Sequence, residues 1–293
     1  MHIPVVVGAL ALTALLLGHG LIPSGIGTWV DALLPWSGLA LIPLAVLALV
    51  LKSGRGAISL LVPLVVLALL FGRDLVPLPS GPVDLRVATQ NLDADNPAQC
   101  KALQALSEAD LLAAQEVTAQ CGLDYPHHFA VGTVALWSRY PITDSARLDL
   151  DLGWYRALRA TVNAPHGPVT VFVAHLGSVR PGATEDRDRS LRRLAELARA
   201  QSGPVLVLGD LNTASTDREM ALFQGFQDAR SGFGFTWPAA FPVVRLDHVL
   251  YRGLTPGSAT TSAANGSDHR AAVAGFTTSG QLAPRAGTAP VTR

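Results

Sequence analysis

Six polar motifs occur between residues 91 and 269, and each lies where an apolar run typical of a buried strand begins or ends. They are Asn91, Gln115-Glu116, His175, Gly209-Asp210-Leu211-Asn212, Asp247-His248 and Ser267-Asp268-His269. A carboxylate at the end of a buried strand is costly unless it binds a cation or a partner. A buried Asp247 likewise needs a donor, which the ring NH of a histidine supplies. Together the motifs predict a site of carboxylates, amides and histidines along one edge of a sheet.

The elements that carry these motifs are mostly strands. Apolar runs predict strands at 85–90, 110–114, 134–138, 158–162, 169–174, 204–208, 245–251 and 271–276, and helical periodicity is present at 97–106 and 185–200. Taken alone, Gly209-Asp210-Leu211-Asn212 is also consistent with a simple Asx-type turn. The order of all six motifs is more specific than any one of them.

In this order the motifs resemble the endonuclease/exonuclease/phosphatase superfamily. That superfamily includes pancreatic-type deoxyribonuclease, abasic-site endonucleases, neutral sphingomyelinases and inositol polyphosphate 5-phosphatases. Residues 138–142 and 235–238 are similar to the family too, and the resemblance covers 84–277. It implies a four-layer α/β sandwich of two mainly antiparallel sheets packed face to face, with helices outside.

The resemblance implies a metal site built from oxygen ligands. Glu116 is expected to be the principal ligand of Mg²⁺, or of Mn²⁺, with Asn91 and Asp268 nearby. Hard oxygen ligands suit Mg²⁺, which keeps several of its waters.

The resemblance also implies roles in the hydrolysis of a phosphate ester. Asp210 would orient or deprotonate the attacking water, and Asn212 and His175 would hold phosphoryl oxygens. His269 would act on the phosphate or the water, with Asp247 fixing its tautomer.

One arginine is expected to add positive charge near the phosphate, together with Asn91. Arg156 and Arg159 point to opposite faces of a strand, and we favour Arg156. His248 should face away from the site, and His127, His128 and His166 lie in turn-like contexts that predict surface positions.

The N-terminal part of the chain is very poor in charge. Residues 1–80 hold only Asp31, Lys52, Arg55, Arg73 and Asp74. Three uncharged runs, 3–22, 32–51 and 56–72, are each long enough to cross a bilayer as a helix. A signal peptide is disfavoured because no Lys or Arg precedes Ile3. The sequence thus predicts a multi-pass membrane segment at 1–72.

The loop charges predict the orientation of these spans. Lys52 and Arg55 lie in the loop between the second and third spans, whereas the loop 23–31 has no Lys or Arg. The positive-inside rule then places Lys52 and Arg55 in the cytoplasm and the domain at 84–277 outside it. Residues 73–83 are predicted to be a short, stiff linker, and 278–293 a disordered tail.

Charge and architecture narrow the range of possible substrates. After residue 80 the chain has 19 basic and 20 acidic residues, which excludes binding of nucleic acid by bulk charge. Three spans followed by this domain resemble the membrane phosphatases associated with teicoplanin resistance, a form of antibiotic resistance. Those enzymes are linked to undecaprenyl pyrophosphate, the carrier lipid of cell-wall synthesis. The first hypothesis is therefore a metal-dependent hydrolase of a lipid-linked phosphate at the outer face of the membrane.

Two other hypotheses remain open. One is a membrane-tethered extracellular nuclease that cleaves DNA or RNA. Arginines in the helix at 185–200 could serve it, but the acids of the same helix make a solvated mixed face the simpler interpretation. The other is a catalytically inactive module that senses phosphorylated lipid. The presence of all the catalytic residue types argues against this second hypothesis. No stable protein partner is inferred.

Cys100 and Cys121 are the only cysteines of the chain. If the strands before them run parallel, both sulfurs lie at the edge of the sheet beside Glu116. An extracytoplasmic location favours a disulfide, whereas two buried free thiols are the alternative. A zinc site is disfavoured because matched histidines are missing.

Overall fold

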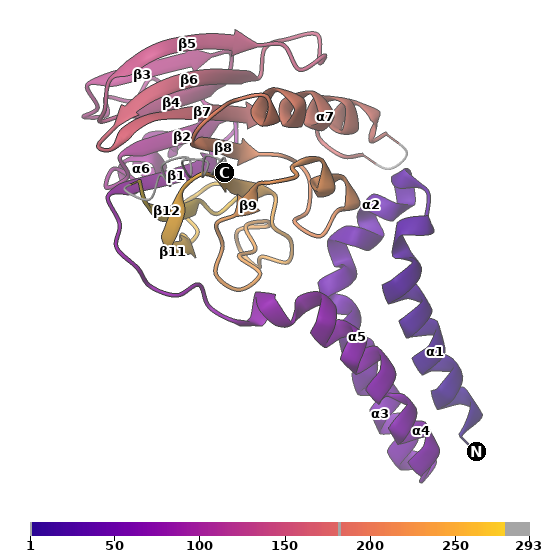
Figure 1. Ribbon diagram of the computed structural model, residues 1–293. Helices are drawn as coiled ribbons and strands as arrows, with labels where there is room; N and C mark the ends of the chain where they lie inside the picture. The colour runs from indigo at the N-terminus through magenta and orange to yellow at the C-terminus, as the bar shows by residue number, and fades with distance from the viewer. Residues whose placement is uncertain (1, 181–182, 279–293) are drawn as a thin grey trace, which may run out of the picture.

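The computed structural model describes residues 2–180 and 183–278, and it contains an α/β sandwich preceded by apolar helices (Figure 1). Sheet A holds, in spatial order, β11 (Thr255–Thr261), β12 (Ala272–Thr277), β1 (Leu85–Asn91), β2 (Leu111–Gln115), β4 (Val134–Ser138) and β3 (His127–Val131). Sheet B holds β5 (Ile142–Leu148), β6 (Ala157–Ala164), β7 (Gly167–His175), β8 (Val205–Asp210), β10 (Asp247–Arg252) and β9 (Gln227–Asp228).

The pairing of the strands confirms the predicted architecture. Each sheet has one parallel pair, β1–β2 in sheet A and β7–β8 in sheet B, and all the other pairs are antiparallel. Val87 and Leu136 of sheet A share one buried core with Val171, Leu208 and Val249 of sheet B. The two sheets therefore pack face to face.

Helices cover the outer faces of both sheets. In α7 (Glu185–Arg199), Leu191 and Leu194 pack on Phe172 and Val207 of sheet B. In α6 (Gln99–Gln104), Leu103 belongs to the cluster on the outer face of sheet A. A short 3-10 helix, η4 (Arg218–Leu222), follows β8. The result is the expected sandwich of four layers.

All eight predicted strand regions are strands in the structure, but β3, β5, β9 and β11 were not predicted. In β5 most side chains are exposed or half-buried, so no run of apolar residues marks it. His127 and His128 do not lie in a turn, because both belong to β3 at the edge of sheet A, but His128 is exposed and His127 half-buried, close to the predicted surface positions. His166 lies in the turn between β6 and β7 and is half-exposed beside Asp84.

The N-terminal segment comprises α1 (Ile3–Gly18), η1 (His19–Leu21), α2 (Ser24–Leu33), η2 (Leu34–Ala40), α3 (Leu41–Val50), α4 (Gly54–Ser59), α5 (Leu61–Phe71) and η3 (Gly72–Leu75). Continuous helical stretches at Ile3–Leu21, Gly25–Val50 and Gly54–Leu75 are each long and apolar enough to cross a membrane. Their apolar side chains point outward, with Leu49 at 76 % and Leu69 at 80 % exposure. A surface of this kind requires apolar surroundings.

The second helical stretch begins earlier than predicted. Residues 24–31 form most of α2, whereas the sequence predicted a loop over 23–31 because Asp31 is charged. The Asp31 side chain is fully buried, with Arg218 Nε donating to Asp31 Oδ2 at 2.8 Å. Because its charge is paired by a residue distant in sequence, Asp31 does not end the helix.

The sandwich is attached to these helices through aromatic packing. The ring centroid of Trp36 lies 5.6 Å from that of Phe235, and Phe71 lies 6.0 Å from Phe233. Trp36 Nε1 also donates to the Val243 carbonyl oxygen at 2.7 Å. The loop before β10 therefore packs the sandwich against η2 and the C-terminal end of α5.

Of the predicted linker, 73–75 belong to η3, and residues 76–83 run along the sandwich as a connection without regular secondary structure (Figure 1). Arg230 Nη2 donates to Asp74 Oδ1 at 2.7 Å, and the Gly81 amide donates to the Gly257 carbonyl at 2.8 Å. The end of the chain, 279–293, which includes nearly all of the predicted tail, lies outside the described residues.

Cys100 and Cys121 form the predicted disulfide, with 5.2 Å between their Cα atoms. β1 and β2 run parallel, as the prediction required, and Cys100 lies in α6 between them. The bond closes the segment that contains Glu116.

We expect removal of this disulfide to lower the free energy of unfolding by about 3 kcal/mol, because it closes a loop of modest length in the unfolded chain. The measurement is denaturant unfolding of Cys100→Ser in detergent micelles, with and without reductant. Reductant should lower the stability of the natural protein to that of the variant and leave the variant unchanged. Labelling of both thiols in unreduced protein would contradict the bond.

Candidate active site

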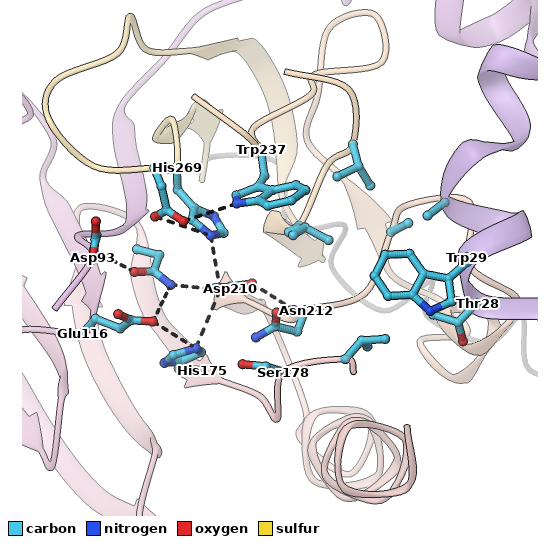
Figure 2. A pocket seen from close by; sticks show the side chains of 17 residues that line it. Thr28, Trp29, Asp93, Glu116, His175, Ser178, Asp210, Asn212, Trp237 and His269 are labelled. Atoms are coloured by element: carbon cyan, nitrogen blue, oxygen red, sulfur yellow. Dashed lines mark hydrogen bonds and ion pairs between the residues drawn. The ribbon is translucent and has the colours of Figure 1, made fainter. Parts of the chain in front are cut away.

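A cavity of about 300 Å³ opens where the polar ends of four strands meet (Figure 2). Asn91 ends β1 and pairs in register with Gln115 of β2, which precedes Glu116. His175 ends β7 and pairs in register with Asp210 at the end of β8. Because each of these pairs is parallel, their carboxyl ends lie at the same edge.

The Asn91 amide joins two carboxylates across the two sheets. Its Nδ2 atom donates to Glu116 Oε1 and to Asp210 Oδ2, each at 3.0 Å. Glu116 Oε2 accepts from the Ala94 amide at 2.9 Å. The two acids are thus close neighbours, but they lie at the ends of strands in two facing sheets, whereas the sequence analysis predicted the edge of a single sheet.

Glu116 is held in a costly backbone conformation, with φ at 56°. Gln99, almost fully buried, donates from Nε2 to the Glu116 carbonyl at 2.8 Å. Gln99 Oε1 accepts from the amides of Thr118 and Ala119. The Gln99 side chain therefore fixes the turn that aims Glu116 into the cavity, a role that the sequence analysis missed.

The oxygen donors at this centre fit a hard divalent cation. Glu116 and Asp210 supply carboxylate oxygens, which is the chemistry that Mg²⁺ prefers, and Asn91 bridges them through Nδ2 while its Oδ1 atom accepts from the Asp93 amide. Within the described residues no three His, Cys, Asp or Glu side chains are grouped to hold a metal by themselves. Mg²⁺ is usually bound by one or two carboxylates together with water and substrate phosphate. The centre thus fits Mg²⁺ better than a metal that needs a closed set of protein ligands.

His175 lies beside both acids but does not neutralise them. Its Nε2 atom is 3.6 Å from Glu116 Oε1 and 3.7 Å from Asp210 Oδ2. Burial, helped by the Arg156 charge and only partly opposed by Asp210, lowers the pKa of His175 to about 4. The ring is therefore uncharged at neutral pH, which leaves the negative charge of the acids available to a cation.

Arg156 is the arginine that reaches the site, as the sequence analysis favoured. Its Nη2 atom lies 3.1 Å from His175 Nε2. Arg159 instead pairs with Asp144 Oδ2 at 2.5 Å on the outside of sheet B.

His269 and Asp247 form the predicted pair, with 2.7 Å between His269 Nδ1 and Asp247 Oδ2. Burial disfavours the charged ring, but the carboxylates of Asp247 and Asp210 outweigh it and raise the pKa of His269 to about 10. The same pairing outweighs burial at Asp247 and lowers the pKa of its carboxyl. A protonated His269 is thus a donor facing the cavity, with Nε2 at 3.9 Å from Asp210 Oδ2.

The turn after β8 places Asn212 beside these groups. Gly209 has φ at 146°, and a Cβ there would lie 1.9 Å from the Ala174 carbonyl oxygen, so only glycine fits. The Asn212 amide donates to Asp210 Oδ1 at 2.9 Å, and Asn212 Nδ2 donates to the Leu176 carbonyl at 3.1 Å. This is an Asx turn, and Asn212 is also part of the cavity wall.

Asp268 lines the cavity, apart from the two neighbouring acids. Its side chain is 55 % exposed, and its Oδ2 atom accepts from Trp237 Nε1 at 3.3 Å. No described hydrogen bond joins it to Glu116 or Asn91. The acid next to Glu116 is Asp210, and not Asp268, because the Asn91 amide bridges Glu116 and Asp210.

His248 faces away from the cavity, as predicted. Its Nε2 atom contacts the Thr213 carbonyl at 2.8 Å and its Nδ1 atom contacts Asp228 Oδ2 at 3.1 Å. Asp228 also accepts from Arg245 Nε at 2.7 Å, so this group is a structural network.

The cavity contains residues that the sequence analysis did not assign to it. They are Thr28, Trp29, Ala32, Asp93, Ser178, Val179, Ala214, Trp237, Val244 and Leu246. Asp93 and Trp237 lie near motifs and were within reach of the sequence. Thr28, Trp29 and Ala32 come from α2, and no pattern in the chain connects them to a site whose other residues lie between 91 and 269.

Comparisons with solved structures agree with this fold. Humanized D. rerio TDP2 has 17% identity and a TM-score of 0.53, covering 66% of this chain and 98% of that one. A beta toxin from Staphylococcus aureus has 16% identity and a TM-score of 0.51, covering 65% of this chain and 99% of that one. An endonuclease/exonuclease/phosphatase from Beutenbergia cavernae has 18% identity and a TM-score of 0.51, covering 67% and 72%.

Curated relatives match over a shorter region. A UPF0294 protein of Vibrio parahaemolyticus is 34% identical over 98 residues, which are 32% of this chain and 35% of that protein. A UPF0294 protein of Vibrio campbellii is 31% identical over 109 residues, 33% of this chain and 36% of that protein. The matched region therefore spans about a third of each relative.

A family model covers the polar motifs as a set. The model of the Endonuclease/Exonuclease/phosphatase family matches residues 88–269, which include all the site residues described above except those of α2. With two face-to-face sheets and the acids, amide and histidines gathered at one edge, the chain belongs to the endonuclease/exonuclease/phosphatase family, whose members hydrolyse phosphate esters.

Proposed function

We propose that this protein is a membrane-anchored, Mg²⁺-dependent hydrolase that cleaves a lipid-linked phosphate or pyrophosphate at the outer face of the cell membrane. The observation that carries the proposal is the composition of one cavity. Glu116, His175 and Asp210 line it together with Thr28 and Trp29 of the second apolar helical stretch. A substrate bound there has its phosphate and the membrane segment within one site.

The side chains have suitable chemistry for hydrolysis. A bound Mg²⁺, held by Glu116 with Asn91 and with Asp268 as a further candidate, would neutralise charge on the phosphate. Asp210 accepts a proton from the attacking water or orients it in line with the leaving oxygen. The remaining groups, His175, Asn212, Arg156 and protonated His269, donate to phosphoryl oxygens, and the Asp247 carboxylate holds His269 in its charged form.

The orientation in the membrane is a separate prediction. The turn between α3 and α4 lies at the end of the helices that is remote from the sandwich (Figure 1). A reporter fused after Arg55 should be cytoplasmic, and one fused after Ser80 should be extracytoplasmic, because Lys52 and Arg55 favour the inside. Paired alkaline phosphatase and green fluorescent protein fusions measure this. The reverse pattern would place the active site in the cytoplasm and contradict a cell-wall lipid as substrate.

A substrate panel tests the function itself. Purified full-length protein is assayed on undecaprenyl pyrophosphate, phospholipid, sphingomyelin and plasmid DNA, with Mg²⁺ and with excess chelator. Release of phosphate from the polyprenyl substrate, lost with chelator, is the expected result. Turnover of none of the lipids would reject the proposal.

A membrane-tethered nuclease is the second candidate. An open groove beside the site contains Trp154, Tyr155, Arg147 and Arg156, and such aromatic and cationic groups can stack on and bind single strands. D. rerio TDP2, which has 18% identity and a TM-score of 0.53 to this chain, has been solved in complex with a single strand DNA product. Cleavage of plasmid DNA in the panel, without turnover of lipid, would favour this function.

A further inference from the structure

The active-site cavity has two chemically different ends. Figure 2 shows Glu116, His175 and His269 at one end and Trp29 with Thr28, on the helix of the N-terminal segment, at the other. The side chains that accompany Trp29 in the lining include Ala32, Val179, Ala214, Val244 and Leu246, all of them apolar. The cavity is therefore amphipathic, with a site for phosphate chemistry at one end and an aromatic, apolar wall at the other.

Cationic side chains are few around the cavity: protonated His269 is in the lining, and Arg156 lies outside it, against His175. No lysine or arginine occurs among the lining residues that the structure describes. A nucleic acid strand would bring further phosphates into this space, and these would need cationic partners. An apolar chain attached directly to the phosphate would instead meet Trp29 and the apolar side chains of the lining.

Buried polar contacts fix α2 firmly against the sandwich. Arg187, whose side chain is fully buried, donates from Nη2 to Thr28 Oγ1 at 3.0 Å and from Nη1 to Asp217 Oδ2 at 3.0 Å. Thr216 Oγ1 donates to the Asp31 carbonyl at 2.6 Å. Thr28 and Asp31 flank Trp29 in the chain on both sides, so the position of the indole is set by contacts that would be costly to break.

The same arginine connects this wall to the catalytic loop. Arg187 Nη1 also donates to Thr213 Oγ1 at 3.3 Å, next to Asn212. One buried guanidinium therefore holds both α2 and the loop that follows Asp210. This is the arrangement expected where two elements must keep a fixed spacing around a ligand.

We infer that α2 is a working part of the active site, and that Trp29 is a specificity-determining residue that binds the first apolar units of a lipid-linked phosphate. The inference rests on the proposed function and adds to it a subsite for the chain next to the phosphate. The apolar helices then do more than anchor the enzyme, because one of them selects substrates by the hydrophobic group on the phosphate. The rest of a long chain remains among the exposed apolar side chains of the helices.

The test uses a series of substrates that share one head group and differ only in chain length: isopentenyl, farnesyl and undecaprenyl pyrophosphate. Full-length protein in detergent micelles is compared with Trp29→Ala, Trp29→Phe and Ile26→Ala. Ile26 lies on the same helix, is 68 % exposed and does not line the cavity, so it is the matched control. The measurement is kcat/KM for each substrate, with thermal unfolding to confirm that each variant is folded.

The natural protein should prefer farnesyl over isopentenyl pyrophosphate, and Trp29→Ala should reduce that preference about tenfold, because an aromatic contact with the chain is lost. Trp29→Phe should restore most of the preference, and Ile26→Ala should leave it as in the natural protein. A preference that survives in Trp29→Ala, or falls equally in Ile26→Ala, overturns the inference but not the proposed function. Absence of turnover of all three pyrophosphates by the natural protein overturns both.

Discussion

Glu116→Gln is expected to reduce kcat/KM by at least about a hundredfold, because one carboxylate of the cation centre becomes a neutral amide of the same shape. Asn91 Nδ2 lies 3.0 Å from both Glu116 Oε1 and Asp210 Oδ2, so the variant leaves only one of two neighbouring acids charged. A cation bound by so few protein ligands depends strongly on each of them. The measurement is hydrolysis at a series of Mg²⁺ concentrations.

Two controls make this prediction sharp. Glu108→Gln makes the same chemical change at a side chain that is 91% exposed, and it should leave the rate unchanged. Excess chelator should abolish hydrolysis by the natural protein, and added Mg²⁺ should restore it. Full activity of Glu116→Gln, or of the natural protein in chelator, would show that no cation at Glu116 takes part in the reaction.

Asp247→Asn is expected to lower kcat by about 10²–10⁴-fold, the range typical of a lost general acid or base. Asp247 is fully buried and pairs with His269 at 2.7 Å between Oδ2 and Nδ1. Without the carboxylate, the ring loses the partner that orients it and favours its charged form. The asparagine keeps an oxygen that can accept from the ring, so we expect the variant to remain folded.

The comparison here is with Asp144→Asn, which removes an exposed acid paired with Arg159 and should not change kcat. Kinetics measured alongside denaturant unfolding separate loss of chemistry from loss of structure. An unchanged kcat in Asp247→Asn would mean that the Asp247–His269 pair takes no part in turnover.

Much of the site could be predicted because its residues belong to patterns that are visible within short stretches of the sequence. Buried strands appear as apolar runs, and the polar residues that end them, such as Asn91, His175 and Asp210, mark the edge where parallel strands finish together. The three apolar runs and the paired cysteines are equally local or compositional features. For the same reason β5 escaped prediction, since its exposed side chains carry no apolar periodicity.

Other features depend on contacts between residues that are far apart in the chain. A loop was predicted up to Asp31 because an unpaired charge is costly in an apolar helix. In the structure Arg218 pairs with Asp31, and the helix begins before this residue. Gln99 is an ordinary helix residue in sequence, but the hydrogen bonds of its buried side-chain amide hold the strained turn of Glu116.

By itself, the sequence determined the family-type sandwich, the order of its acids and histidines, the apolar helices and the cysteine pair, because side-chain chemistry and hydrophobic periodicity act over neighbouring residues. Only the tertiary structure decided that α2 closes the active-site cavity with Trp29. That placement arises from Arg187 and Arg218, whose hydrogen bonds to Thr28 and Asp31 join segments more than 150 residues apart. Such pairing has no local signature, since it exists only once the chain has brought the two surfaces together.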